Sequence, residues 1–308
     1  MRRRTTVKAL NSVSFSIKPR ETLGVVGESG CGKSTLARAV LGLYPVNSGE
    51  IYYKGNRIDN LGPQKMLPYR KKMQMIFQDP YASLNPRMTV KKMLEEPVIF
   101  HNKSIRPTEV ADKVAEVMQQ VGVDPAWADR YPHEFSGGQR QRISIARALT
   151  VDPEFIVADE PVSALDVSIQ AQILNLLMEA QEKRGLTYMF ITHDLSVVEH
   201  FSSRVAVMYL GILSEMSPTK DLFDSPLHPY TQALLSAIPE LGRQKPKHIK
   251  LKGEVPTPID LPPGCVFHGR CLYAKDVCKK NVPELREIAP DHWAACHFAG
   301  KVGVRHSF

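Results

Sequence analysis

Four short runs of apolar residues recur along the chain, each followed by a polar loop and then by sequence with helical spacing. The runs are "TLGVVG" at 22–27, "KMQMIF" at 72–77, "EFIVAD" at 154–159 and "TYMFIT" at 187–192. Continuous apolar runs of this length are typical of strands buried on both faces of a parallel sheet. The pattern therefore predicts an α/β fold with a mostly parallel, doubly wound sheet.

The rhythm changes between residues 86 and 150, where helical spacing continues with no strand between the segments. These segments are "VKKMLEEPVIF", "TEVADKVAEVMQQVG" and "RQRISIARALT". They predict a helical insert in the α/β core. Farther along, "RVAVMYLGILSEM" at 204–216 predicts two strands around Gly211, and "VSFSI" at 13–17 has the alternation of a strand.

Beyond Ser217 the chain becomes rich in proline and basic residues. Six prolines, at positions 239, 246, 256, 258, 262 and 263, punctuate a basic stretch. Such punctuation favours a segment that follows a surface over one that builds a core. We therefore divide the chain into a core at 1–85 and 150–216, a helical subdomain at 86–149, and a C-terminal extension at 217–308.

Composition narrows the class of protein. Hydrophobic residues make up 43% of the 308 residues, which is ordinary for a globular chain. No run approaches the 18 apolar residues of a membrane span. The start, "MRRRTTVKALNSVSF", is charged but is not followed by the apolar segment of a signal peptide. We expect a cytoplasmic chain, in which clustered cysteines more often mean metal than disulfides.

The net charge of +8 is compatible with nucleic acid, an anionic membrane surface or nucleotide phosphates as partners. The basic residues are scattered, and their densest runs are "RRR" at the start, "YRKKMQ" near residue 70 and "GRQKPKHIKLK" at 242–252. No aromatic residues are interleaved with them in the way that stacks unpaired bases. A solvated basic surface is therefore favoured over a nucleic-acid site.

The stretch "GESGCGKST", Gly27 to Thr35, fits the phosphate-loop pattern and lies between a predicted strand and a predicted helix. Its glycines let backbone N–H groups wrap phosphates at the helix N-terminus. Lys33 would hold the β- and γ-phosphates of ATP, and Ser34 would offer its hydroxyl to Mg²⁺. The context favours phosphate binding over a structural glycine turn. The loop residues expected at the nucleotide are Gly27, Ser29, Gly30, Cys31, Gly32, Lys33, Ser34 and Thr35.

A second acidic motif, "FIVADEP", ends an apolar strand with Asp159 and Glu160. An acid at that strand end can hold Mg²⁺ through water, and the next carboxylate can polarise an attacking water. The alternative is a pair of surface acids. A phosphate loop in the same chain makes the metal and water roles the better interpretation.

Several further motifs occur in a fixed order with these two. They are "FSGGQRQR" at 135–142, Gln78 in "IFQDP", "SALD" at 163–166 and His193 in "ITHD". Together they resemble the ATPase cassette of ABC transporters over nearly the whole chain. "PYASLNP", "HDLSVVEH" and "HPYTQALLSAIP" resemble the dipeptide/oligopeptide importer branch. The signature has Phe135 where leucine is commoner in the family, a change we expect to be harmless.

The resemblance implies a P-loop ATPase core with a helical subdomain and a cysteine-containing C-terminal extension. In such proteins two cassettes close head to tail around two ATP molecules. Glu160 would be the general base, His193 would contact the γ-phosphate, and Gln78 would sense Mg²⁺ and water. Asp166 would cross to the partner's phosphate loop. The signature residues, whose helix N-terminus would face the partner's ATP, are Ser136, Gly137, Gly138 and Gln139.

The resemblance also implies the partners. We expect a paralogous ATPase subunit, two transmembrane permease subunits, indirectly a substrate-binding protein, and no nucleic acid, at the cytoplasmic face of the membrane. The permeases' cytoplasmic helices would dock near Gln78 and the helical insert. The cargo stays open, because nickel, glutathione or another small solute would suit the same cassette. A soluble nucleic-acid ATPase of this family would carry a coiled-coil insertion or two cassettes, and neither is present.

One departure concerns the adenine base. Family members place an aromatic residue well upstream of the phosphate loop, whereas Phe15 is the only aromatic among the 26 residues before Gly27. We expect that the chain begins late and lacks the first strand. Base stacking contributes about 1–3 kcal/mol, so its loss would weaken ATP binding by about tenfold.

Four of the five cysteines lie in the last 45 residues, with the spacing C-x5-C-x6-C-x17-C. Structural zinc sites favour closer pairs, whereas loose spacing suits the larger core of a [4Fe–4S] cluster. The family resemblance implies that this cluster is held by Cys265, Cys271, Cys278 and Cys296.

Two alternatives to the cluster remain open. One is Zn²⁺, with His268, His292 or His297 replacing a thiol, and the other is four ordinary thiols. A cluster would stabilise a C-terminal segment that is too small to form a core of its own. The alternative role, redox sensing, would require a cluster that solvent can reach. Cys31, in the phosphate loop, is interpreted as a small packing residue.

Overall fold

A computed structural model describes residues 6–238 and 249–302 of the chain. Two compact units are distinguished. The first unit comprises Met1–Ile17, Thr22–Leu36 and Thr192–Phe308, and the second comprises Lys18–Glu21 and Ala37–Ile191. The "RRR" run and most of "GRQKPKHIKLK" lie outside the described residues, as do Pro239 and Pro246. Within the described part of the chain, no helix combines the length and the apolar character needed to cross a membrane.

The second unit contains three parallel strands, β4 (Met73–Ile76), β5 (Phe155–Asp159) and β6 (Thr187–Ile191). Met75 lies opposite Val157, which in turn lies opposite Met189. All five residues of β5 are buried, as expected for a strand with a parallel neighbour on each side. Three of the predicted strands are thereby confirmed.

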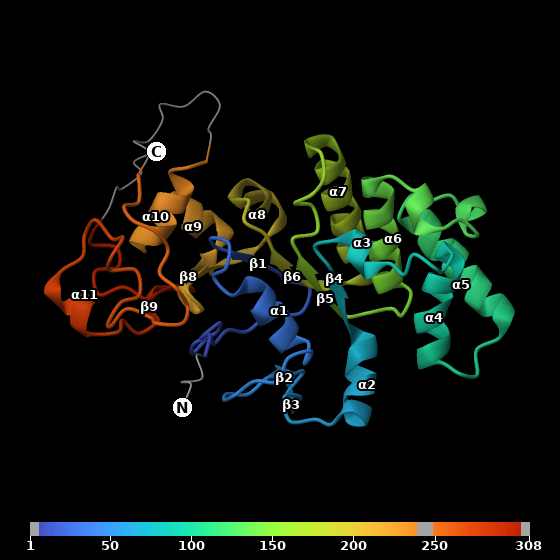
Figure 1. The fold of residues 1–308 in the computed structure, drawn as a ribbon, viewed down its shortest axis with the longest axis horizontal. Helices are drawn as coiled ribbons and strands as arrows, with labels where there is room; N and C mark the ends of the chain where they lie inside the picture. Colours follow the sequence, from blue (N-terminus) through green and yellow to red (C-terminus); the bar gives the residue numbers. More distant parts are fainter. Residues whose placement is uncertain (1–5, 239–248, 303–308) are drawn as a thin grey trace, which may run out of the picture. The chain divides into compact units, whose positions relative to one another are not determined.

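The helical insert of the second unit is formed by α4 (Val90–His101), α5 (Pro107–Gln120) and α6 (Gly137–Leu149), with short 3-10 turns at Pro125–Trp127 and Pro132–Glu134. The three helices pack against one another (Figure 1). α5 buries one face at helical spacing, through Val110, Val114, Val117 and Met118. The helical insert predicted from the sequence is confirmed.

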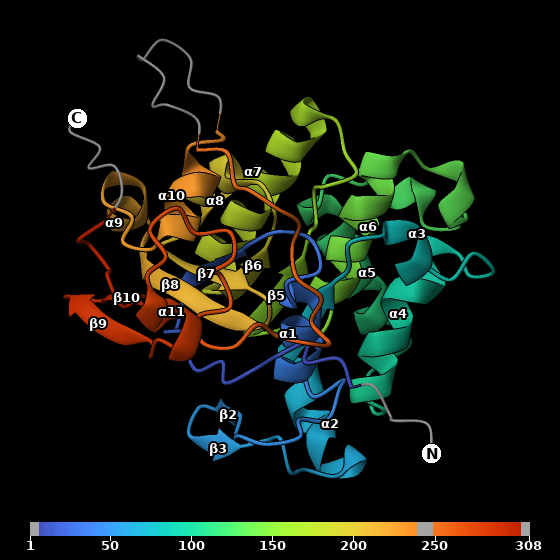
Figure 2. The same ribbon diagram turned by 60° about the vertical axis from the view of Figure 1, so that its left-hand side comes forward.

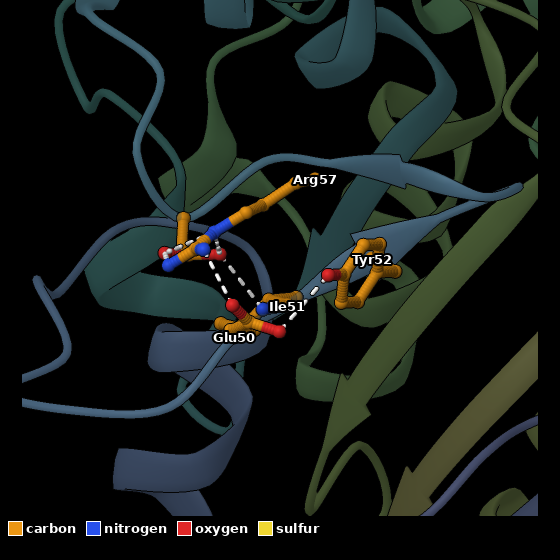
Figure 3. A network of polar contacts seen from close by, with 5 residues as sticks. Glu50, Ile51, Tyr52 and Arg57 are labelled. Carbon is orange, nitrogen blue, oxygen red and sulfur yellow. Dashed lines mark hydrogen bonds and ion pairs between the residues drawn. The ribbon is translucent and has the colours of Figure 1, made fainter.

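The remaining elements of the second unit are α2 (Pro63–Lys72), α3 (Pro80–Ser83), α7 (Val167–Arg184) and a hairpin of β2 (Tyr52–Tyr53) and β3 (Asn56–Arg57). Polar contacts hold the hairpin (Figure 3): Tyr52 Oη donates to Glu50 Oε2 at 2.9 Å, and the Arg57 guanidinium contacts Glu50 and Asp59. The Ile51 N–H donates to Asp59 Oδ1 at 2.8 Å. These side-chain contacts stabilise a hairpin whose strands, at two residues each, form few backbone hydrogen bonds.

The first unit contains a mixed sheet in the order β1-β7-β8-β10-β9. β1 (Thr22–Val26) runs parallel to β7 (Arg204–Tyr209), which pairs antiparallel with β8 (Ile212–Pro218). The turn between β7 and β8 places Leu210 and Gly211 at positive φ (45° and 77°), as a tight hairpin turn requires. The fourth predicted strand run and the two strands around Gly211 are confirmed.

The helices of the first unit are α8 (Leu195–Phe201), α9 (Thr219–Asp224), α10 (Pro229–Leu235) and α11 (Asp276–Lys280), and α1 (Lys33–Val40) begins in it. Its core gathers side chains from distant parts of the chain, among them Val26, Tyr209, Tyr230 and Phe267. Phe267 belongs to the cysteine-containing segment. The C-terminal residues therefore contribute to the core of the unit that carries β1.

The strand predicted from the alternation at residues 13–17 is wrong, because no strand forms there. Residues 249–263, the described end of the proline-rich stretch, contain no helix or strand. Farther along, β9 (Arg286–Ala289) and β10 (His292–Ala294) extend the sheet from the edge of β8 (Figure 2). An unpaired edge strand offers a row of free N–H and C=O groups, and β10 covers that of β8.

Candidate functional site

The phosphate loop follows the buried strand β1 and can be built only with glycine at two points. Gly27 has φ 152°, and a Cβ there would lie 2.2 Å from the Met208 carbonyl oxygen. Gly32 has φ 106°, and its Cβ would lie 2.3 Å from the Ala9 carbonyl oxygen. Since both neighbours are backbone atoms, a larger residue would displace the loop. Ser29 and Gly30, at the tip, are exposed.

The Lys33 side chain lies inside the loop. Its Nζ donates to the carbonyl oxygens of Gly27 at 2.7 Å and Glu28 at 3.1 Å, and only 5% of the residue is exposed. A buried ammonium needs such partners. The positive charge of Lys33 therefore lies inside the loop, where phosphates would enter. Ser34 and Thr35 are half-buried in the first turn of α1.

Cys31 packs beneath the same loop. It is buried, and its Sγ lies 3.9 Å from Lys33 Nζ. Burial raises the pKa of the Cys31 thiol, although the Lys33 charge opposes the shift. The thiol is thus kept protonated at neutral pH, and Cys31 acts here as a small buried side chain.

In the second unit, β5 ends at Asp159, which is 2% exposed. The next residue, Glu160, has a left-handed backbone with φ 48°. Its N–H donates to the Ile191 carbonyl oxygen at 2.9 Å, and its carbonyl oxygen accepts from Ser163 Oγ at 3.1 Å. Left-handed conformations of non-glycine residues are uncommon and cluster at functional sites.

Gln78 meets Glu160 although 82 residues separate them. Gln78 Nε2 donates to Glu160 Oε2 at 2.9 Å. The parallel pairing of β4 with β5 accounts for the contact, because the two residues follow the carboxyl ends of adjacent strands. An amide and a carboxylate at this edge could together orient a water molecule.

The signature segment begins α6 with a capping box. Ser136 Oγ accepts from the Gln139 N–H at 3.3 Å, and Gln139 Oε1 accepts from the Ser136 N–H at 2.9 Å. A Cβ on Gly138 would lie 2.7 Å from Ile169 Cγ2 in α7. Ser136 and Gly137 are exposed. The N-terminus of α6, which carries a partial positive charge, is therefore open to a ligand from outside the chain.

Asp166 and His193 both lie on exposed turns that precede a helix. Asp166 is the N-cap residue of α7, but its side chain makes no capping hydrogen bond. His193 precedes Asp194, whose Oδ1 accepts from the Ser196 N–H at 2.9 Å and caps α8. Both side chains stand on backbone that the following helix fixes.

The predicted residues divide between the two units. The phosphate loop and His193 belong to the first unit, whereas Gln78, Asp159, Glu160 and Asp166 belong to the second together with the signature segment. Of these, the structure brings Gln78 and Glu160 together within the second unit.

Comparison with known proteins gives the family. A family model described as "ABC transporter" matches residues 10–163, which include the phosphate loop, Gln78, the signature and Glu160. The chain belongs to the ABC transporter family. A second model, described as "Oligopeptide/dipeptide transporter, C-terminal region", matches residues 214–278.

Relatives with assigned names support the assignment. The chain is 57% identical over 295 residues to the oligopeptide transport ATP-binding protein AppF of Bacillus subtilis, covering 94% of this chain and 89% of AppF. It is 52% identical over 292 residues to the dipeptide transport ATP-binding protein DppF of Haemophilus influenzae, with 94% and 89% covered.

Solved structures share the fold. The ATP-binding cassette MJ0796, in a dimeric post-hydrolysis state with ADP and Pi, matches with 30% identity and a TM-score of 0.63, covering 68% of this chain and 90% of that chain. CbiO1 of Clostridium perfringens, part of an ABC transporter complex, matches with 28% identity and a TM-score of 0.64, covering 70% and 84%. The protein is an ABC-type ATPase with a P-loop α/β core.

The four C-terminal cysteines of this ABC ATPase line one small cavity in the first unit, together with His228, His268 and His297. Burial raises the pKa of Cys265 and of Cys296 to about 11, and the neighbouring thiols add to each shift. The Cys265 N–H donates to the Cys278 carbonyl oxygen at 2.8 Å. Cysteines that are widely spaced in the sequence thus line the same cavity.

No three Cys, His, Asp or Glu side chains among the described residues converge closely enough to hold a single metal ion. His292 does not line the cavity: its Nε2 donates to the buried Glu215 carboxylate at 2.7 Å. The proposal of His292 as a zinc ligand is therefore wrong. His268 and His297 do line the cavity, but a nitrogen of each lies within 3.0 Å of a backbone carbonyl oxygen.

Sequence reasoning missed two contacts on the phosphate loop. The Glu28 N–H donates to Tyr230 Oη at 2.9 Å, and the Glu28 carboxylate accepts two hydrogen bonds from Arg270, at 2.6 and 3.0 Å. Arg270 lies between two of the cysteines. The one available signal was a carboxylate in a loop that binds anions, since such a charge needs a partner.

Proposed function

We propose that this ATPase powers the import of dipeptides or oligopeptides across the cytoplasmic membrane, acting at its cytoplasmic face. The observation that carries the proposal is the match of residues 214–278 to the C-terminal region of oligopeptide/dipeptide transporters. The relatives named for oligopeptide and dipeptide transport support it. The proposal includes the division into an ATPase core, a helical subdomain at 86–149 and a C-terminal extension at 217–308.

The partners are a related second cassette, two permease subunits and, through them, a substrate-binding protein. The N-terminus of α6 supports a second cassette, because Ser136 and Gly137 are exposed there and the dipole of the helix favours a phosphate at that end. One cassette fills its own phosphate loop with its own ATP. The phosphate at the signature would therefore come from the other cassette, and Asp166 would face that cassette's phosphate loop.

The functional side chains divide the tasks of hydrolysis among them. Lys33 passes from the loop carbonyls to the β- and γ-phosphates, and His193 contacts the γ-phosphate. Glu160, aimed by its left-handed backbone, accepts the proton of the water that attacks the γ-phosphorus as the bond to the bridging oxygen breaks. Gln78 orients that water. Ser34, Asp159 and Gln78 would hold Mg²⁺, which neutralises charge on the phosphates.

For the C-terminal cavity we propose a [4Fe–4S] cluster held by Cys265, Cys271, Cys278 and Cys296, with zinc as the alternative. The donor set fits, because four thiols line one small cavity. Tetrahedral zinc would draw its thiolates to about 2.3 Å from the metal, whereas a [4Fe–4S] core spreads its four thiolates over a larger volume. The cluster would hold the segments that carry its ligands.

Transport by the assembled complex tests the function. The chain would be purified with the membrane proteins that accompany it and placed in vesicles with the matching binding protein. A dipeptide or tripeptide should accelerate ATP hydrolysis and accumulate inside, and Glu160→Gln should abolish both. Acceleration by nickel or glutathione and not by peptides would reject the peptide cargo while leaving the ATPase assignment intact.

A further inference from the structure

The phosphate loop is held from outside by two residues of the C-terminal part of the chain. Both contacts are made to Glu28, the second residue of "GESGCGKST". Tyr230 accepts the hydrogen bond of the Glu28 N–H, and Arg270 grips the Glu28 carboxylate with both terminal nitrogens. Glu28 and Arg270 are 242 residues apart. All three residues belong to the first unit.

The Glu28–Arg270 contact is of a strong kind. The Arg270 side chain is 10% exposed and that of Glu28 is 27% exposed, so water screens the pair only in part. Two parallel N–H···O bonds fix the carboxylate in orientation as well as position. The guanidinium also lies 5.9 Å from the centre of the Tyr209 ring, within the range of a cation–π contact.

The Glu28 charge has a direct bearing on nucleotide binding. A carboxylate in a loop that wraps phosphates repels them, and the repulsion is strong where water is partly excluded. Arg270 cancels that charge. Tyr230 holds the backbone of Glu28 through its N–H, and the carbonyl oxygen of the same residue accepts from Lys33. Fixing the loop before ATP arrives reduces the conformational freedom lost on binding.

Arg270 is in turn fixed by the cysteine-containing segment. The N–H groups of Arg270 and Cys271 both donate to the Phe267 carbonyl oxygen at 3.0 Å. The Phe267 ring packs against Tyr209 and Tyr230, with centroid distances of 5.2 and 5.4 Å. The aromatic core thus connects the wall of the cysteine cavity to the phosphate loop.

We propose that Arg270 and Tyr230 are positioning residues for the phosphate loop, so that the C-terminal segment sets the affinity of the ATPase for ATP. Arg270 neutralises Glu28 and orients it, and Tyr230 fixes its backbone. The inference rests on the proposed nucleotide site and is independent of the proposed cargo.

The test compares variants of the full chain by the Kd for ATP, measured by displacement of a fluorescent analogue, and by KM and kcat. Arg270→Gln should raise Kd and KM about tenfold, which is about 1.4 kcal/mol, and leave kcat at saturating ATP unchanged. Iron and sulfide content should also stay unchanged. Lys280→Gln, the same charge change at an exposed residue of α11, should have no effect on affinity.

A second set of variants distinguishes loss of the charge that neutralises Glu28 from a general loss of folding. Glu28→Gln combined with Arg270→Gln should bind ATP within about threefold of Glu28→Gln alone, because no carboxylate is then left unpaired. Arg270→Lys should lie between the parent and Arg270→Gln, and Tyr230→Phe, which loses the acceptor, should bind more weakly than the parent. The lysine and phenylalanine variants decide the matter if Arg270→Gln does not fold.

Equal affinity of Arg270→Gln and the parent would overturn the inference. So would a double variant as weak as Arg270→Gln alone, or a loss confined to kcat, which would indicate a smaller folded fraction. A parent chain that binds no ATP would instead reject the proposed nucleotide site. Failure of the inference about Arg270 and Tyr230 can therefore be distinguished from failure of the proposed nucleotide site.

Discussion

Replacing His292 by alanine should destabilise the first unit by about 3 kcal/mol. The Glu215 side chain is fully buried. Its carboxylate accepts from the N–H groups of Leu227 and His228 at 2.7 and 2.9 Å, and from His292 Nε2 at 2.7 Å. The substitution removes one of these three partners and leaves a buried carboxylate with the other two. A loss of this size is a large part of the roughly 5–15 kcal/mol that stabilises a typical protein.

Urea unfolding of the full chain, followed by circular dichroism, gives the free energy of unfolding of each variant. His292→Gln keeps an N–H donor near Glu215 and should lose only about 1 kcal/mol. Arg286→Ala, on the exposed strand β9, serves as the control and should stay within about 0.5 kcal/mol of the parent.

A His292→Ala variant as stable as the parent would refute the reasoning, because the buried Glu215 carboxylate would then lose no stability with its third hydrogen-bond partner. Zinc analysis of the same variant adds a second criterion. If His292→Ala lost bound metal but kept its stability, His292 would act as a ligand after all.

Three further predictions concern the chemistry. Glu160→Gln should still bind ATP but hydrolyse it at least about 100-fold more slowly; near-normal turnover in steady-state assays would reject the general base. Lys33→Ala should weaken ATP binding by at least about tenfold, and unchanged Kd would contradict the phosphate-loop assignment. Protein purified without oxygen should be brown. Cys265→Ser should remove the colour and the iron, whereas Cys31→Ser should not. Metal analysis that finds one zinc and no iron per chain would reject the cluster in favour of a zinc site.

The strands of both units that carry apolar runs could be predicted, because a strand buried between parallel neighbours needs apolar residues at every position. β5, which lies between β4 and β6, is of this kind. The segment 13–17 has apolar residues at alternate positions, and these side chains are half-buried. Alternation predicted which side chains face the protein, but a strand also needs a hydrogen-bonded neighbour, and that information is not local.

β9 and β10 could not be predicted for the opposite reason. All four residues of β9 are exposed and β10 has three residues, so neither leaves a hydrophobic pattern. In the candidate site, too, some features follow from a local sequence pattern and others do not. The loop glycines follow from a local motif, whereas the contacts of Glu28 with Tyr230 and Arg270 depend on residues more than 200 positions away.

The first unit is assembled from both ends of the chain, which has a consequence for its synthesis. β1 pairs with β7, Leu23 lying opposite Arg204. Glu28 can contact Arg270 only after Arg270 has been synthesised. At about 5–20 residues per second, the 242 residues between them take on the order of 10–50 s to leave the ribosome. For most of that time β1 is an apolar strand without its β7 neighbour, so the nascent chain should be a substrate for chaperones until β7 emerges.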